Sequence, residues 1–396
     1  MDAETAYLFR HALVRDAAYE LQPVTDRALL HGLAVDVLED RFGGTPEIES
    51  PHWLAPLRAH ESDSYALELA RHARLASVAV SGTAGKLLLR KSAIYLRRAA
   101  NLDREGYRNP SAMKLYEQLQ QHPGADEFIR ADAHLCVGQL HYRLGNVLEA
   151  GEEYEKARRL IPESDKIGRM LVKGGITIVG SHEDNGPHVA EAHHEAAEFW
   201  RGIGDLRRQV GSLINYAVWH CEEGDLDVAR NALEQAIELA REHGHPRYEE
   251  AALGTLALID DRQGRHAEAE AGLRRALAIA AAMDNLGAEL NWACALAARI
   301  RDAQRLDHAE DVLRDVIERA PLQGLVARVD YARAQLAGVL ALAGRVDEAR
   351  KLWNLARAAL VARKDEYLCR VSQEEMNVQL EKAGLPELLE DGTFPD

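Results

Sequence analysis

Small and apolar residues recur along this chain at a spacing of about forty positions. The clearest marker is a Gly followed five residues later by Ala, as in the segments LGNVLEA, EGDLDVA, QGRHAEA and AGRVDEA. These glycines are Gly145, Gly224, Gly264 and Gly344, and the same spacing passes through Asn185 and Gln304, each also followed by Ala. Six units therefore recur at intervals of 39 or 40 residues. This regularity predicts an internal structural repeat.

The positions around this Ala predict two helices in each unit. A large residue follows four positions later and a small or branched one seven positions later, so that the three share one stripe of an α-helix. In most units another small residue stands twelve positions before the Ala, and helices with small facing residues can pack closely across a short turn. Each unit is therefore predicted to be a helical hairpin whose apolar face is buried by its neighbours. The large residues of the six units are Tyr154, His194, Leu233, Leu273, Leu313 and Trp353.

Two units depart from the pattern. An earlier, weaker unit carries Ala100, Ala112 and Tyr116 with an irregular turn, which brings the expected number of hairpins to about seven. In the second of the six regular units Gly174 and Gly175 disfavour the first helix, and we expect a kink or a change of pitch there. We also expect His194 in that unit to be partly buried between helices and His193 to be solvated.

The repeat resembles the tetratricopeptide repeat (TPR) family. Its pattern of small residue, Ala, aromatic residue, Ala and Pro is matched in residues 131–164 by Gly138, Ala150, Tyr154, Ala157 and Pro162. The period exceeds the usual length of about 34 residues, and is similar to the long-helix repeats of bacterial regulators such as the MalT-like activators. The resemblance implies an all-α fold, a right-handed α-α superhelix of the TPR-like solenoid type, with a short N-terminal helical cap.

Residues 1–42 do not follow the repeat. They predict a helix that stops near Pro23 and a second one that begins at Thr25 as N-cap and ends at Gly43 and Gly44. The apolar positions expected along the second helix are Leu29, Leu30, Ala34 and Leu38.

The same stretch resembles the end of the ATPase module of STAND-type regulators, including ATPase-linked cyclases and kinases of bacteria. That pattern ordinarily precedes a TPR array, and the resemblance implies that this chain is the C-terminal part of a larger regulator without its ATPase core. We therefore expect an N-terminal cap over residues 1–60, a solenoid over 61–384 and a tail over 385–396. The matching residues are Phe9, His11, residues 13–16, Tyr19, Arg27, Leu30, His31, Ala34, Leu38 and Glu39.

Composition narrows the range of functions. The formal charge is −16, with a pI near 5.6, which argues against a nucleic-acid-binding protein because phosphate recognition needs positive potential. The four cysteines are far apart and form no CxxC pair, as expected for a reducing cytoplasm. No apolar run is long enough to span a membrane, and we expect a cytoplasmic protein.

No motif argues for catalysis, a cofactor or a metal. The segment GTAGKL, residues 82–87, has the wrong spacing for a P-loop and lacks its hydroxyl residue, so we expect a loop that opens a helix at residues 87–89. The pair His193–His194 lies among acidic residues without a metalloprotease spacing. An enzyme with an unfamiliar site is the weakest alternative; activity that depends on a buried carboxylate or His would support it.

The expected function is therefore binding. The resemblance implies that the first helix of each hairpin lines a concave groove, which would hold a protein or peptide segment or the chain's own upstream ATPase. The alternative is an effector-sensing domain that binds a small molecule or peptide to control a regulator. A pocket of a few hundred Å³ would favour the alternative, and a long open trough the first interpretation. The groove residues expected from the repeat are Gln139, Tyr142, Arg143, His182, Asn215, Val218, Glu222, Asp261, Arg262, Asn291, Arg301 and Tyr331.

Overall fold

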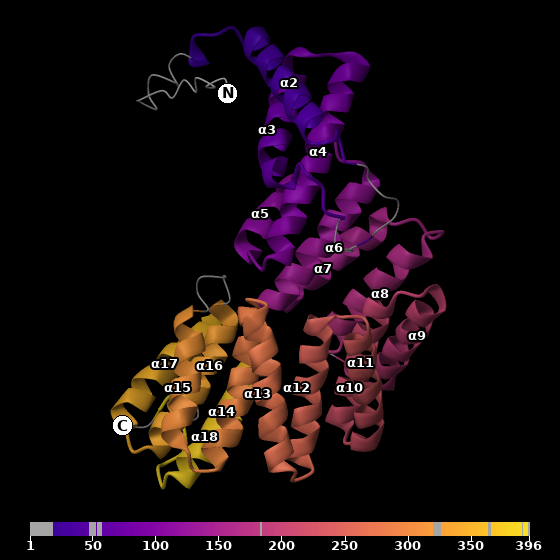
Figure 1. Ribbon diagram of the computed structural model, residues 1–396. Helices are drawn as coiled ribbons and strands as arrows, with labels where there is room; N and C mark the ends of the chain where they lie inside the picture. Colours follow the sequence, from indigo (N-terminus) through magenta and orange to yellow (C-terminus); the bar gives the residue numbers. More distant parts are fainter. Residues whose placement is uncertain are drawn as a thin grey trace, which may run out of the picture. The chain divides into compact units, whose positions relative to one another are not determined.

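The computed structural model describes residues 19–46, 53, 58–182, 184–319, 326–362, 366–389 and 391–394. Throughout these ranges the regular elements are helices and no strand occurs (Figure 1). The predicted all-α fold is therefore confirmed. None of the helices in the described ranges has the length and apolar character needed to cross a lipid bilayer. Of the residues that resemble the STAND module, those before position 19 lie outside the described residues.

The chain divides into two compact units. Unit 1 comprises Met1–Val137 and Lys156–Gly168, and unit 2 comprises Gly138–Glu155 and Arg169–Asp396. This division differs in its boundaries from the cap, solenoid and tail expected above, which stay predictions.

Unit 1 contains α2 (Val24–Arg41), α3 (Ala66–Ala76), α4 (Gly82–Glu105) and α5 (Asn109–Gln120), joined in part by short 3-10 helices at Asp63–Tyr65 and Ser77–Ala79. Each of these α-helices packs against the next. Ala100 of α4 and Ala112 and Tyr116 of α5 are fully buried, as expected for the earlier, irregular hairpin.

Two expectations for unit 1 were wrong. Helix α2 begins at Val24 after Pro23, so Thr25 is not its N-cap, and its buried residues include Ala28 and Val35, whereas Leu29 and Leu30 are exposed. Residues 82–87 are helical and do not form the expected loop, because α4 begins at Gly82. A side chain at residue 85 would lie 2.1 Å from the carbonyl oxygen of residue 80, and Gly85 leaves the space that lets the helix begin this early.

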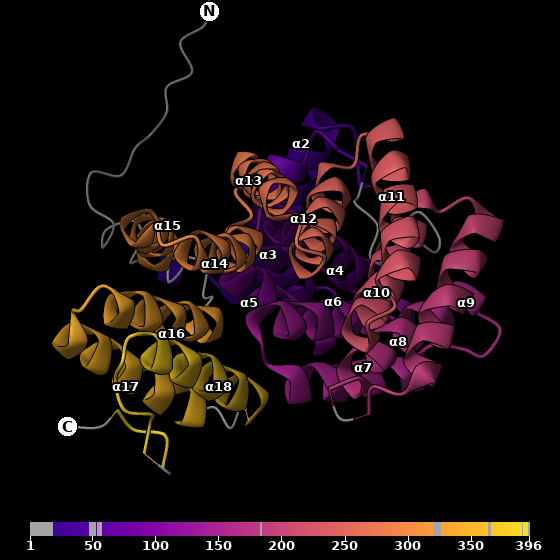
Figure 2. The same ribbon diagram turned by 90° about the horizontal axis from the view of Figure 1, so that it is seen from below.

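The remaining helices form six consecutive hairpins followed by a single helix. Figure 2 shows that α13, α15 and α17 lie farther out than α12, α14 and α16, and in α10 to α18 the first helices of successive hairpins contact one another. The hairpins are α6 (Glu127–Leu144) with α7 (Val147–Leu160), α8 (Lys166–Gly180) with α9 (Pro187–Ile203), α10 (Leu206–Glu223) with α11 (Leu226–Glu242), α12 (Pro246–Arg262) with α13 (His266–Ala282), α14 (Leu286–Asp302) with α15 (Leu306–Arg319), and α16 (Val326–Leu342) with α17 (Val346–Ala362); α18 is Glu366–Lys382.

The turn positions of the repeat adopt one conformation. The four marker glycines have φ between +75° and +90°, in the left-handed region where a Cβ is disfavoured. Gln304, which replaces Gly in its unit, has the same conformation with φ of +61°. The turn is therefore set by the packing of its two helices, and the glycine only makes it easier to form.

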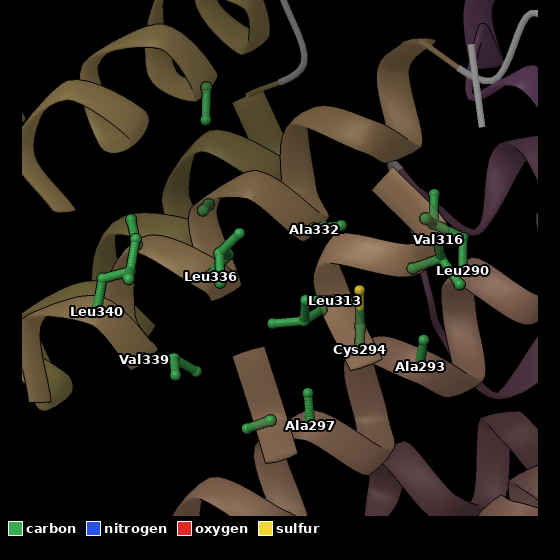
Figure 3. Packing of buried hydrophobic residues seen from close by; sticks show 14 of the residues in the cluster. Leu290, Ala293, Cys294, Ala297, Leu313, Val316, Ala332, Leu336, Val339 and Leu340 are labelled. Atoms are coloured by element: carbon green, nitrogen blue, oxygen red, sulfur yellow. The ribbon is translucent and has the colours of Figure 1, made fainter. Parts of the chain in front are cut away.

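The apolar stripe predicted for the second helices is the core of the solenoid. Tyr154, Leu233, Leu273, Leu313 and Trp353 are all 5 % exposed or less. Figure 3 shows Leu313 of α15 within the cluster that also contains Cys294 and Ala297 of α14 and Leu336 of α16. Stacking of neighbouring hairpins thus buries the faces that a single hairpin would leave open.

The second regular unit keeps its first helix but differs from expectation in its second. Helix α8 runs from Lys166 to Gly180 through Gly174 and Gly175, and a Cβ at Gly175 would stand 2.8 Å from the ring of Tyr154 of α7. The kink or change of pitch expected here stays a prediction. In α9 it is His193 that is buried, while His194 is exposed, the reverse of the assignment expected above. The small residues Ala190 and Ala197, which hold the register positions of the repeat, are buried in α9 as in the other units, and the large buried residues beside them are His193 and Trp200.

Candidate functional site

The first helix of the third regular hairpin, α10, presents polar and apolar side chains at one face. Asn215, Val218 and Glu222 follow each other at intervals of three and four residues, so they share one side of the helix. The other side is fixed by burial of Val210, Leu213 and Ala217 in the core of α9 to α12. Because the core holds α10 in this rotation, the three side chains project away from it.

These three residues line a pocket of about 380 Å³ in unit 2. The pocket brings together α6, α8, the segment after it, α9, α10 and α18. Its lining is Tyr142, Ile178, Ser181, His182, Asn185, Val189, His193, Asn215, Val218, Trp219, Glu222 and Arg370.

Aromatic and aliphatic side chains form the apolar part of the pocket. The rings of Tyr142 and His182 meet edge to face with centroids 6.1 Å apart. Trp219 is 9 % exposed, and Val218 beside it is 37 % exposed. An apolar ligand group in this place would be removed from water by two rings and a branched side chain.

The segment between α8 and α9 is tied to α10 by hydrogen bonds. The Trp219 Nε1–H donates to the main-chain oxygen of Asn185 at 3.0 Å, and the Asn185 side-chain amide donates to Glu222 Oε2 at 2.8 Å. These bonds hold one rim of the pocket in place and engage one oxygen of Glu222.

Asn215 stands apart from this arrangement. In the described part of the chain nothing forms a hydrogen bond with its side-chain amide, which is half-buried in the pocket wall. An amide offers a donor and an acceptor at the same time, the complement of a peptide unit of an extended ligand. Its counterpart three hairpins further along the repeat, Gln335, is instead bonded to both Arg301 and Glu375.

His193 forms the most buried polar part of the lining. It is 6 % exposed, and burial lowers the pKa of its imidazole to about 4. At neutral pH it is therefore uncharged, so the inner wall of the pocket carries no positive charge from this side chain. The guanidinium of Arg370, which pairs with Glu374 at 3.4 Å, supplies positive charge from α18.

The structure brings five of the twelve expected groove residues into this one pocket: Tyr142, His182, Asn215, Val218 and Glu222. Four others have their polar groups engaged within the fold. Arg262 donates to the main-chain oxygen of Cys221, and Asp261 accepts from Arg299 at 2.9 Å.

Arg301 and Tyr331 belong to a second internal network. Arg301 Nη1 donates to Gln335 Oε1 at 3.1 Å, and the Tyr331 hydroxyl donates to the Glu375 carboxylate at 3.2 Å. Burial of this carboxylate raises the pKa of Glu375. The network joins α14, α16 and α18, so these side chains contact neighbouring helices of the repeat. Of the remaining three, Gln139 and Arg143 are half-buried on α6 and Asn291 is exposed on α14, and none of them lines the pocket.

Sequence reasoning missed the other lining residues for identifiable reasons. Ile178, Ser181 and Asn185 lie at the end of the irregular α8 and after it, where the repeat gives no register. Arg370 lies on α18, far away in the sequence, and nothing in its surroundings marks it. For Trp219 the sequence offers one signal, because this large aromatic residue directly follows the expected groove residue Val218.

No catalytic arrangement emerges in the described residues. Nowhere in these ranges do three or more His, Cys, Asp or Glu side chains gather in a way that could hold a metal ion. Burial raises the pKa of the Cys136 thiol to about 11 and also raises that of Cys221, which opposes formation of a nucleophilic thiolate at neutral pH.

Comparison with known proteins agrees with this architecture. A family model described as tetratricopeptide repeat matches residues 208–282, which include most of α10 and the whole of α11, α12 and α13. No curated protein matches the chain. The chain thus carries tetratricopeptide repeats in this segment and the fold of a TPR-like α-solenoid.

Solved structures of low sequence identity share the fold. A Rap protein complexed with Competence and Sporulation Factor is 14 % identical, with 82 % of this chain and 97 % of that chain covered and a TM-score of 0.54. NprR in complex with its cognate peptide NprX is 14 % identical over 81 % and 95 % of the two chains, with a TM-score of 0.55.

A STAND protein with a tetratricopeptide repeat sensor from Pyrococcus horikoshii also matches. It is 15 % identical, with 91 % of this chain and 57 % of that chain covered and a TM-score of 0.45. A likeness of this degree does not test the resemblance of the N-terminal residues to a STAND module, which stays a prediction.

Proposed function

We propose that this chain is a non-catalytic binding module whose unit 2 captures a short peptide, or an extended segment of a protein, in the pocket beside α10. The observation that carries the proposal is the unbonded amide of Asn215 next to an apolar wall. The amide would bond one peptide unit of the ligand, while Tyr142, Val218 and Trp219 would enclose an adjacent apolar side chain.

The size of the pocket fits one or two ligand residues. A volume of about 380 Å³ lies at the lower end of the range of ligand pockets, roughly 300–1,000 Å³. The two solved structures of similar fold described above are complexes with a peptide and with Competence and Sporulation Factor, and this supports a peptide as the class of ligand.

The same volume favours a second candidate, the sensing of a small effector. A molecule with an apolar body and an anionic group would place the body against Trp219 and the anion near Arg370. In either case the chain would act as the recognition part of a regulator. An upstream NTPase as a further partner, and a cytoplasmic location, belong to this proposal as predictions.

The test is selection of peptides from a random library on the intact chain, followed by calorimetric titration of the selected peptide. We expect Asn215→Ala to weaken binding by roughly ten- to a hundredfold, because one or two buried hydrogen bonds are lost. Asn291→Ala is the matched control, since Asn291 is exposed outside the pocket, and it should leave the affinity unchanged.

Selection that yields no peptide, or peptides equally sensitive to both substitutions, would contradict peptide binding at this site. The small-effector candidate would then be tested with metabolite extracts. A thermal shift that is present in the wild-type chain and lost in Asn215→Ala would support it.

A further inference from the structure

Helix α2 of unit 1 has two apolar faces, and only one of them is covered by the residues that the structure describes. The inner face carries Ala28 and Val35, which are 3 % and 0 % exposed and pack toward α3. The opposite side carries four large apolar residues at helical spacing. These residues, which we call the outer face of α2, are Leu29, Leu30, Leu33 and Val37, with exposures of 68 %, 53 %, 59 % and 57 %.

The four residues form one stripe. At 100° per residue, positions 29, 33, 37 and 30 fall within about 100° of each other, so the side chains stand side by side along roughly two turns. Single exposed apolar residues are common on protein surfaces, but a contiguous stripe of this kind marks an interaction site. A helix that is apolar on opposite sides is normally covered on both.

The flank between the two faces is already occupied by contacts within unit 1. The Tyr19 hydroxyl lies 2.8 Å from His31 Nε2, and His31 Nδ1 lies 2.7 Å from His72 Nδ1 of α3. Glu39 of the inner face bonds Lys91, Tyr95 and Thr45. The outer face lies away from these groups.

Charge identifies the kind of partner. Asp26, Asp36 and Asp40 are exposed and project along or beside the outer face, and the exposed Arg41 lies beside its C-terminal end, so acidic groups outnumber this cation three to one. In the antiparallel self-pairing that places Leu33 opposite its own copy, Asp26 would face Asp40 of the other copy, and a parallel pairing would place each Asp beside itself. Like charges at such distances oppose association, so a second copy of α2 fits poorly.

We propose that the outer face of α2 docks an amphipathic helix of another protein whose apolar stripe is flanked by Lys or Arg. Leu29, Leu33 and Val37 would pack into the apolar stripe, and the flanking Asp side chains would pair with the basic residues. This surface lies in unit 1 and does not depend on the pocket of unit 2.

The test uses the full chain and a labelled 18-residue helical peptide of Leu and Lys as the probe, with its Lys-to-Glu counterpart as the charge control. Fluorescence anisotropy should show binding of the Lys peptide at least tenfold tighter than that of the Glu peptide. Leu33→Glu should weaken the Lys peptide at least tenfold. Leu87→Glu is the matched control, because Leu87 of α4 is 57 % exposed in the same unit, and it should have no effect.

A second variant separates charge from shape. The double substitution Asp36→Lys with Asp40→Lys should reverse the preference between the two peptides. Because all these positions are exposed, the circular dichroism spectrum and the melting temperature of each variant should match those of the wild-type chain. If Leu33→Glu fails this check, Val37→Lys replaces it, and the same loss of at least tenfold in affinity for the Lys peptide is expected.

Three outcomes would overturn the proposal. The first is equal loss of binding in Leu33→Glu and Leu87→Glu, which would make the attraction nonspecific. The second is a dimer by sedimentation that Leu33→Glu dissociates, which would make a second copy the occupant. The third is displacement of the Lys peptide by a synthetic peptide of residues 1–18, which would assign the face to the chain's own N-terminal segment.

Discussion

At the scale of single residues, glycines decide how closely the helices approach. The ring of Tyr154 lies between α6 and α8, and a Cβ added at either Gly138 or Gly175 would stand 2.8 Å from it. Gly254 plays the same part under the ring of Trp292, where a Cβ would stand 2.5 Å away. In these helices the glycines lower the helical propensity, and the packing of a large ring in the vacated space offsets the loss.

The adjacent glycines of α8 give a matched pair of substitutions. Gly175→Ala should destabilise the chain by roughly 1–3 kcal/mol, because the new Cβ would stand 2.8 Å from the buried ring of Tyr154. Gly174→Ala should stabilise it by about 0.5–1 kcal/mol, since no atom lies within 4 Å of the new Cβ and Ala favours the helix. Urea titration of both variants measures the difference; equal effects of the two would show that the ring does not fill this place.

A buried carboxylate makes stability depend on pH. Glu250 of α12 is 2 % exposed and accepts a hydrogen bond from the indole N–H of Trp292, and burial raises the pKa of its carboxyl to about 7. Between about pH 4.5 and pH 7 the folded chain keeps a proton that the unfolded chain releases. The contribution of Glu250 is therefore complete below pH 4.5 and is lost as the pH rises through 7.

The expected loss in unfolding free energy over this range is roughly 1–3 kcal/mol. Glu250→Gln should remove this part of the pH dependence, because the amide does not titrate. The measurement is the difference in unfolding free energy between variant and wild type at several pH values. Taking this difference removes the contribution of His193 to the pH dependence, which is common to both chains. Because the pKa of His193 is lowered, its contribution has the opposite sign between about pH 4 and 6.5. A difference that stays constant with pH would show that Glu250 is ionised in the folded chain.

At the scale of helices and hairpins, neighbouring hairpins are connected by ion pairs as well as by the buried core. Arg305 and Arg345 occupy equivalent turn positions and reach back to Glu270 and Glu310 at the start of the second helix of the preceding hairpin. Such exposed ion pairs contribute little individually. The larger share of the stabilisation comes from the stripe of fully buried small and large residues between the helices.

Substitutions in this stripe test the register of the hairpins. Ala229→Leu and Ala269→Leu should each cost roughly 1–3 kcal/mol by overpacking, because both residues are fully buried. Leu313→Ala should leave a cavity and cost roughly 2–5 kcal/mol. Leu355→Ala, at a residue that is 54 % exposed, is the control with little expected effect. Denaturant titration measures all four, and neutral results for the buried positions would contradict the register.

The hairpins could be predicted from the sequence because every hairpin packs through the same positions, so Ala229, Leu233 and Ala236 have counterparts at the same spacing in the other units. The prediction failed in the second regular unit, where different side chains fill these positions. In α9 His193 is buried and His194 is exposed, although Ala190 and Ala197 keep the register of the other units. In α2 the expected apolar positions Leu29 and Leu30 lie on the exposed side, since pattern alone does not tell which of two apolar faces is covered.

The binding site could be predicted only in part, because the repeat pattern describes single helices and not the contacts between them. The repeat indicated which side of each first helix lines the groove, and this was enough to select Tyr142, Asn215 and Val218. It carries no information on which polar groups are already bonded to a neighbouring helix, as Arg301 and Tyr331 are. Nor does it place Arg370 of α18 beside α10 within unit 2.

At the scale of the whole molecule, the two proposed surfaces belong to different units of the chain. The pocket belongs to unit 2, and the outer face of α2 belongs to unit 1. Under the two proposals taken together, the chain would hold one partner at α2 while it recognises another ligand in the pocket. The substitutions proposed for the two surfaces fall in different units, so the two can be studied independently.

The most direct measurement of the central claim is site-specific photo-crosslinking in the full chain. A small diazirine amino acid replaces Val218, which lines the pocket, or Val228 of α11, which does not; the two are 37 % and 41 % exposed. After irradiation in cells, mass spectrometry should find a peptide or protein segment attached at position 218, and the attachment should be lost in Asn215→Ala. Two results would contradict binding in this pocket. One is adducts of the same kind at both positions, and the other is the absence, at position 218, of any adduct that is lost in Asn215→Ala.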